Sequence, residues 1–112
     1  MGQKQWQSNQ FNARVAGDTA WTNESLREAP AGGLGIYITD INVNAGATSS
    51  TWSLLDGSGG TAVWKATPAA NTSIHVSLAV PIRLTAATAL CLTTSGDSVG
   101  ASAHVNGFIA RR

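Results

Sequence analysis

The chain has 112 residues, which suffices for one domain around a single hydrophobic core but not for two. Charged residues make up 12% of it, about half the usual share, and the formal net charge is +1. This composition excludes the basic stripe of a nucleic-acid-binding protein, and no apolar run reaches the roughly 20 residues that span a membrane. Because a surface that faces only water carries more charge, we expect a partner, neither nucleic acid nor membrane, to cover part of it.

The first 28 residues are polar and largely irregular. The opening ten, MGQKQWQSNQ, lack the apolar centre of a secretory signal, so we expect synthesis in a cytoplasm. A strand is expected near residues 5–15. Residues 16–33 include Pro30 and the pair Gly32–Gly33 and are interpreted as an irregular connection. We therefore divide the single domain, 1–112, into an N-terminal arm and connection, 1–28, and a β-sandwich, 29–112.

Residues 34–43 predict a strand with a bulge. Apolar residues occupy every second position from Leu34 to Ile38, and again from Ile41 to Val43 on the opposite parity. One extra residue near Thr39 and Asp40 would return both halves to a common face.

Residues 51–56 and 61–66 predict a hairpin that turns at Gly57-Ser58-Gly59-Gly60, where glycine permits positive φ. A loop of four residues divides the large side chains between two faces, Trp52, Leu54 and Val63 on one and Leu55 and Trp64 on the other. A loop of three residues places Trp64 on the same face as Trp52 but leaves Leu55 and Val63 on the other face. In both registers the two faces are apolar, so we expect another subunit or a partner to cover one of them.

One further strand and a second hairpin complete the pattern. Apolar residues alternate from Ile74 to Val80, which predicts a half-buried strand that ends at Pro81. Residues 88–95 and 98–110 are predicted to pair through a two-residue type II′ turn at Gly96-Asp97. This register sets Leu92 opposite Ala101 and Leu90 opposite Ala103, with Thr94 facing Val99 and with Cys91 and His104 on the polar face.

Short strands separated by turns rich in Gly, Pro, Ser and Thr are typical of a sandwich. No segment shows a sustained helical period; the best helical candidate, residues 23–29, is too short to stand alone. The predicted fold is all-β, an antiparallel β-sandwich or jelly-roll of about seven to eight short strands.

The chemically reactive residues do not form a recognisable catalytic pattern. Cys91 and His104 are candidates for a nucleophile–base pair, but no carboxylate is placed to orient the histidine. His75 with these two residues lacks the close paired spacing of zinc motifs. The six acidic residues are scattered along the chain. We expect neither an enzyme nor a cofactor or metal site.

Aromatic residues supply candidates for an interface. Trp52 is expected in the core. Trp6, Phe11 and Trp21 lie in the polar first quarter of the chain, where aromatic side chains are plausible anchors for a partner. The candidate interface residues are Trp6, Phe11, Arg14, Trp21 and Trp64. We expect the segment from Met1 to about Arg14 to grip a partner or a neighbouring copy. The same aromatic residues would also suit a sugar-binding platform, so a carbohydrate-binding module is the alternative function.

Several segments carry a resemblance. The order APAGGLGIYITDINV, WSLLDGSGGTAVW, AANTS, VPIRLTAATALCLTTS and VNGF resembles small β-sandwich virion structural proteins of tailed bacteriophages. The similarity spans residues 29–108 and departs at residues 87–92, where Ala and Cys replace the usual Asn. It implies a head decoration, or cement, protein that binds the major capsid protein on the outer surface of the virion. It also favours a homotrimer, because such proteins often occupy local threefold axes. The alternative is a carbohydrate-binding or adhesion module of a tail or fibre.

Overall fold

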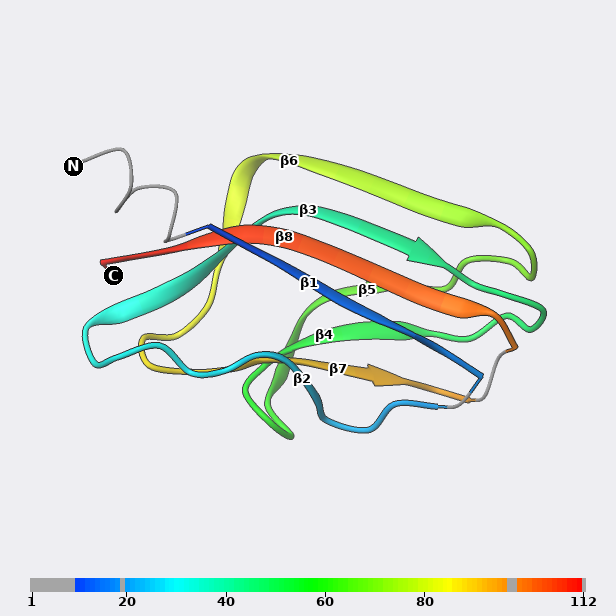
Figure 1. Ribbon diagram of the computed structural model, residues 1–112, viewed down its shortest axis with the longest axis horizontal. Coiled ribbons are helices and arrows are strands. Elements are labelled where there is room, and N and C mark those ends of the chain that lie inside the picture. Colours follow the sequence, from blue (N-terminus) through cyan, green and yellow to red (C-terminus); the bar gives the residue numbers. More distant parts are fainter. Residues whose placement is uncertain (1–9, 19, 97–98, 112) are drawn as a thin grey trace.

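The computed structural model describes residues 10–18, 20–96 and 99–111. The regular elements of these residues are eight strands: β1 (Gln10–Gly17), β2 (Glu24–Arg27), β3 (Leu34–Asn44), β4 (Trp52–Asp56), β5 (Thr61–Ala66), β6 (Ser73–Arg83), β7 (Leu90–Thr94) and β8 (Ala101–Arg111). They form two antiparallel four-stranded sheets, with the orders β1-β8-β3-β6 and β2-β7-β4-β5 (Figure 1). The predicted all-β sandwich is confirmed. In the described ranges, no helix is long and apolar enough to cross a bilayer.

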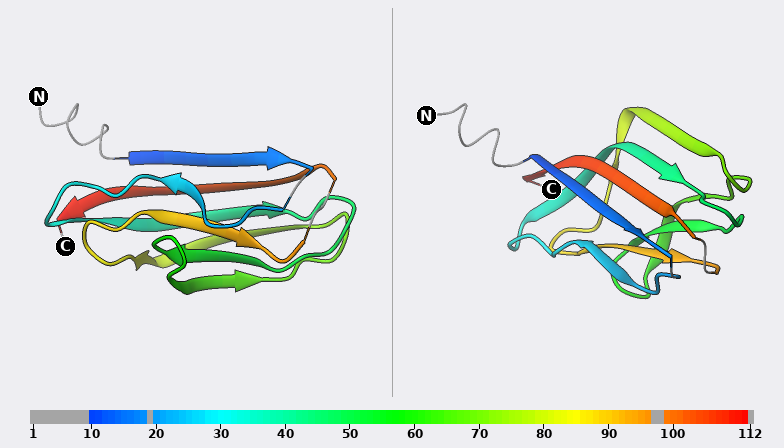
Figure 2. Two further views of the ribbon diagram at one scale, coloured as in Figure 1. Left: turned by 90° about the horizontal axis from the view of Figure 1, so that it is seen from below. Right: turned by 45° about the vertical axis from the view of Figure 1, so that its right-hand side comes forward.

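The strand order is that of an eight-stranded jelly-roll. Among the eight strands, only β4 and β5 follow one another within a sheet; each of the other six connections passes to the opposite sheet. The two sheets lie face to face as layers, as the right-hand view of Figure 2 shows. Strands that adjoin in space are therefore mostly distant in sequence, and β1 at the start of the fold pairs with β8 at its end.

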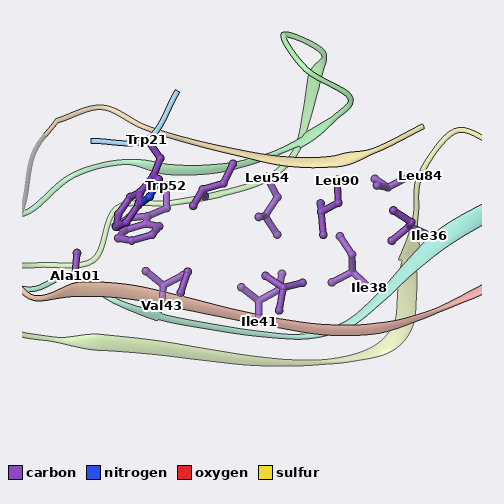
Figure 3. Packing of buried hydrophobic residues seen from close by; sticks show 13 residues of the cluster. Trp21, Ile36, Ile38, Ile41, Val43, Trp52, Leu54, Leu84, Leu90 and Ala101 are labelled. Atoms are coloured by element: carbon purple, nitrogen blue, oxygen red, sulfur yellow. The ribbon is translucent and has the colours of Figure 1, made fainter. Parts of the chain in front are cut away.

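The core lies between the two layers (Figure 3). Trp21 and Trp52 meet at one end of it, with ring centroids 5.5 Å apart, while Ile36 and Leu84 lie at the other end. Both sheets contribute fully buried branched side chains, and the small Ala101 and Ala103 give the tryptophans room. Trp52 is in the core, as predicted.

The predicted bulge in β3 is confirmed. Ile38 pairs with Gly107 and Asp40 pairs with Asn106, so Thr39 is the extra residue against β8. The residues before and after the bulge consequently turn to the same face, and the large side chains Ile36, Ile38, Ile41 and Val43 are all buried.

The β4–β5 hairpin combines the two registers that the sequence left open. Asp56 pairs with Thr61, which gives the loop of four residues. However, the register shifts at Val63, so that Trp64 pairs with Leu54. Trp64 therefore lies on the same face as Leu54 and packs, partly buried, against the core.

The loop of this hairpin folds back over the outer side of β7. The Gly57 N–H donates to the Ala89 carbonyl, and the Gly59 N–H donates to Asn23 Oδ1, each at 2.9 Å. Since β7 separates β2 from β4, the loop must cross β7 to reach Asn23, just before β2. Cys91 of β7, which alternates with the inward-facing Leu90 and Leu92 and so points away from the core, is only 2% exposed. Leu55, on the outer side of the hairpin, is only 8% exposed in the single chain, so its burial does not require another subunit.

The predicted β7–β8 hairpin is wrong. β7 pairs with β2 and β4, whereas β8 pairs with β1 and β3, so Leu90 and Leu92 face Ala101 and Ala103 across the core and not along a ladder. Asp97 lies outside the described residues, and Val99, which we expected on the inner face, is 63% exposed. The alternation in β7 and β8 correctly predicted which side chains face inward. It did not predict which strands pair, because the connection from β7 to β8 passes from one sheet to the other.

The N-terminal division is also corrected. Residues 10–17 form β1 and residues 24–27 form β2, so both strands belong to the sandwich, which begins before residue 29. β2 is short, mostly exposed and irregular in register, which explains why no period marked it. Pro81 lies inside β6, an edge strand, where the missing N–H does not break a ladder. The register shift there leaves Val80 79% exposed.

Candidate binding face

Three adjacent strands, β1, β8 and β3, carry polar side chains at alternate positions. Successive residues of a strand point to opposite faces, and the apolar set points into the core. The intervening set forms an outer surface that we call the amide face. It consists of Gln10, Asn12 and Arg14 of β1, Ser102, His104, Asn106 and Phe108 of β8, and Tyr37, Asp40, Asn42 and Asn44 of β3.

Cross-strand pairing aligns the amide face in rows. In one row Asn106 of β8 pairs with Asn12 of β1 on one side and with Asp40 of β3 on the other. Two residues along the strands, His104 pairs in the same way with Arg14 and Asn42. Directly paired side chains start about 5 Å apart, so each row gathers its polar groups side by side on the outer surface.

Asp40 is held in place by two hydroxyl groups. The Ser77 hydroxyl donates to Asp40 Oδ1 at 2.8 Å, and the Thr39 hydroxyl donates to Oδ2 at 3.2 Å. The Thr39 oxygen also lies 3.2 Å from the Asn106 carbonyl oxygen. The bulge thus does more than reset the alternation, because it places a hydroxyl group beside the carboxylate.

An aromatic pair adjoins this row. The rings of Tyr37 and Phe108 are stacked, with centroids 4.9 Å apart and an interplanar angle of 3°. The Tyr37 hydroxyl donates to the Arg111 carbonyl at 3.1 Å, which fixes the far end of that ring. Phe108 pairs with Tyr37 on one side and with Gln10 on the other, so its second ring face is directed toward β1.

Two hollows lie along the amide face. The larger, of about 570 Å³, is lined by residues 10–12 of β1, by Thr39 and Asp40 of β3 and by residues 106–108 of β8. The smaller, of about 250 Å³, includes Arg14 and His104 together with hydroxyl and amide side chains of β3, β6 and β8. Both hollows follow the three strands that carry the amides.

The structure separates the five candidate interface residues. Arg14 is exposed on the amide face; Phe11 is half-buried, with the Arg27 guanidinium 5.9 Å from its ring centroid. Trp21 is buried in the core beside Trp52, so its side chain is not available to a partner. Trp64 keeps part of its surface open, and Trp6 lies outside the described residues. The four described candidates do not form one site.

Residues 10–14, which we expected to grip a partner as part of a free arm, instead pair with residues 104–108 of β8. These residues are therefore not a free arm, while Gln10, Asn12 and Arg14 remain exposed on the edge strand β1. Residues 1–9, the rest of the segment expected to grip a partner, lie outside the described part of the chain.

The proposed neighbours Cys91 and His104 lie in opposite sheets, Cys91 on β7 and His104 on β8. They are not diagonal neighbours on one hairpin, because that hairpin does not form. Burial raises the pKa of the Cys91 thiol, and the nearby negative charge of Glu24 adds to the effect. A raised pKa keeps the thiol protonated and unreactive. Within the described ranges, no group of three or more His, Cys, Asp or Glu side chains is placed to hold a metal ion.

Two of the scattered acidic residues hold loops together. Asp56 accepts hydrogen bonds from the backbone N–H and the hydroxyl group of Thr85, the latter at 2.6 Å. Asp18 accepts a hydrogen bond from the Gly100 N–H at 2.8 Å. These carboxylates stabilise connections between the two sheets, which accounts for their dispersal along the sequence.

Sequence reasoning concentrated on the tryptophans and missed the amide face. The signal is present as polar residues at every second position in QFNAR, DINVN and SAHVN, residues 10–14, 40–44 and 102–106. Each segment predicts only a strand with one polar side. Nothing in the sequence indicates that the three polar sides adjoin, since the pairing of β1 with β8 and of β8 with β3 joins distant segments.

Comparison with models of protein families finds no match, and comparison with curated proteins finds none either. Among solved structures, the chain is similar to the coat protein of Tobacco streak virus, with a TM-score of 0.47 and 12% sequence identity. The alignment covers 92% of this chain and 86% of the coat protein chain. A likeness at this level carries no argument about function.

Proposed function

We propose that the chain is a structural protein of a virus particle, and more narrowly a decoration protein on the head of a tailed bacteriophage. The observation that carries this proposal is the coincidence of the sequence resemblance with an eight-stranded jelly-roll. The resembling segments correspond to β3, to the β4–β5 hairpin, to β6 and β7, and to β8. They fall in six of the eight described strands and in the turn that joins β4 to β5, as expected if the scaffold from β3 to β8 is shared.

The composition supports a role in assembly. A chain with 12% charged residues presents fewer repelling charges to a neighbour than an ordinary soluble domain. In this proposal the partner is the major capsid protein, several copies bind around a local threefold axis, and the protein is located on the outer surface of the virion. No catalytic step belongs to the proposed role.

The test is localisation in purified particles. Virions from cells infected with the virus that encodes this sequence are purified on a density gradient, and immunogold labelling then locates the protein by electron microscopy. We expect label over the whole head at a fixed number of copies per capsid subunit. Label on the tail or fibre would replace the decoration role with that of a tail module. Absence of the protein from purified particles would overturn both.

A further inference from the structure

The larger hollow of the amide face has the size and lining of a small-molecule site, and the proposed structural role does not use it. Its volume of about 570 Å³ lies within the usual range of ligand pockets, roughly 300–1,000 Å³. We propose that this hollow binds a neutral carbohydrate, with Asn12, Asp40 and Asn106 hydrogen-bonded to its hydroxyl groups and Phe108 packed against a sugar ring.

The hydrogen-bonding groups of the hollow match the hydroxyl groups of a sugar. A sugar hydroxyl both donates and accepts, and a side-chain amide offers two donors and an acceptor in one plane. Asn12 and Asn106 are neighbours in register, and Gln10 supplies a third amide at the rim. Asn106 Oδ1 is buried and has no hydrogen-bond partner among the described residues, so this amide gains by turning toward a donor.

Asp40 supplies a fixed acceptor. The hydroxyl groups of Ser77 and Thr39 each donate to one of its two carboxylate oxygens, at 2.8 and 3.2 Å. A carboxylate oxygen accepts more than one hydrogen bond, so both oxygens retain capacity for a ligand. Because the side chain is already oriented, binding does not have to immobilise it.

Phe108 supplies the apolar side of the site. Tyr37 covers one face of the Phe108 ring, and the opposite face is directed toward Gln10 and the hollow. The C–H surface of a sugar ring is apolar and flat, and it packs on an aromatic face while the hydroxyl groups at the ring edge reach the amides. A combination of one apolar wall with a few placed polar groups is typical of specific ligand sites.

The charges and the polarity of the hollow select the class of ligand. Among its described lining residues Asp40 alone is ionisable, so an anionic ligand is repelled. Arg14 and His104 belong to the smaller hollow, one row away. The centre of a protein interface is normally apolar, whereas the central row here is Asn12, Asn106 and Asp40. A neutral sugar fits these groups better than an acidic sugar or a protein surface.

The test uses the purified full-length protein and does not depend on any virus particle. The probe is an array of neutral oligosaccharides of hexoses and N-acetylhexosamines, with acidic oligosaccharides beside them. The best ligand is then titrated into the protein and its variants by calorimetry. We expect binding to a neutral oligosaccharide, weakened about tenfold by Asn12→Ala and at least as much by Phe108→Ala. Asn12 is exposed on an edge strand, so its replacement leaves the core intact.

The matched control is Ser25→Ala, a polar-to-alanine change at an exposed position of β2, the edge strand of the other sheet. It should leave the affinity unchanged. The proposal is overturned if the array retains no neutral oligosaccharide, if acidic oligosaccharides bind better, or if Asn12→Ala and Ser25→Ala have equal effects. It is also overturned if Asn12→Ala abolishes attachment to particles while no glycan binds, because the amide face would then be a protein interface. Localisation of the protein in the virion can fail without affecting any of these results.

Discussion

At the scale of single residues, Gly60 shows how closely the glycine-rich loop is packed. A Cβ at this position would collide with the carbonyl group of Asp56 and would also lie 3.2 Å from the Gly57 oxygen. The Gly60 N–H donates to that Gly57 oxygen at 3.0 Å, so the backbone cannot move away without losing the turn.

We therefore expect Gly60→Ala to lower the free energy of unfolding by about 2–3 kcal/mol, as overpacking against rigid neighbours does. Gly32→Ala is the control, because its Cβ would have no heavy atom within 4 Å. That variant should stay within about 0.5 kcal/mol of the original protein. Urea denaturation of the three proteins measures the difference, and equal stabilities would contradict the packing described for the loop.

We expect Cys91 to make the free energy of unfolding fall at alkaline pH. Burial raises the pKa of its thiol above the usual value, so the folded chain holds this proton more tightly than the unfolded chain does. The contribution is complete below the pKa of the unfolded thiol and decreases as the pH rises from there through the folded pKa.

The expected result is a larger loss of unfolding free energy between about pH 7.5 and about pH 10 for the original protein than for Cys91→Ala. Comparing the two proteins removes the contribution of the other groups that titrate in this range. Parallel losses in the two proteins would show that the thiol does not titrate differently on folding.

At the scale of elements, the β4–β5 loop acts as a cover for β7. Asn23 holds this cover through its side-chain oxygen and itself has φ of 51°, a conformation that glycine also adopts easily. The substitution Asn23→Gly therefore removes the hydrogen bond to the Gly59 N–H and keeps the backbone. Loss of about 1 kcal/mol from the closed loop corresponds to about fivefold more of the open form.

We expect Asn23→Gly to raise the rate at which native Cys91 is alkylated by about fivefold. The matched control is Asn71→Gly, which also replaces an asparagine with positive φ, 62°, but lies in the β5–β6 connection. Alkylation followed by mass spectrometry under native conditions measures both rates. A similar acceleration in the two variants would mean that the loop does not protect the thiol.

At the scale of the whole molecule, assembly is the property that the proposed function requires. One argument for a trimer no longer applies, since Leu55 on the outer side of β4 is already buried within a single chain. Exposed apolar side chains remain at Val80 and Val99, and Trp64 is partly open. We still expect a homotrimer, and sedimentation at micromolar concentration should give about three times the 11.5 kDa of one chain. A single species of monomer mass would contradict it.

The N-terminal residues 1–9 are the second whole-molecule test. Deletion of the first 14 residues would remove five of the eight residues of β1 and would damage the sheet, because residues 10–14 pair with β8. Deletion of residues 1–9 is the appropriate variant, and it should fold normally while binding to particles that lack the protein at least about tenfold more weakly, since the aromatic anchor Trp6 is lost. Co-sedimentation with the particles measures the binding. Undiminished binding would show that the sandwich, and not residues 1–9, makes the contact with the particle.

The sequence by itself determined the local features of this protein. The alternation of β3 and its bulge near Thr39 were predicted from the order of consecutive residues, and the glycine-rich turn before Thr61 was predicted with a loop of either three or four residues. Side-chain period and turn chemistry suffice for such features, because they are properties of a few consecutive residues.

Only the tertiary structure decided which strands adjoin. The inward faces of β7 and β8 were predicted, but their placement in opposite sheets was not. An apolar face can be buried either beside a paired strand of the same sheet or against a strand of the opposite sheet, and the alternation is the same in both cases. For the same reason the sequence did not predict the amide face, which forms because β1 and β3 lie on either side of β8. Pairing between distant segments is selected by how well all eight strands bury their apolar sides together, and no short stretch of sequence contains that information.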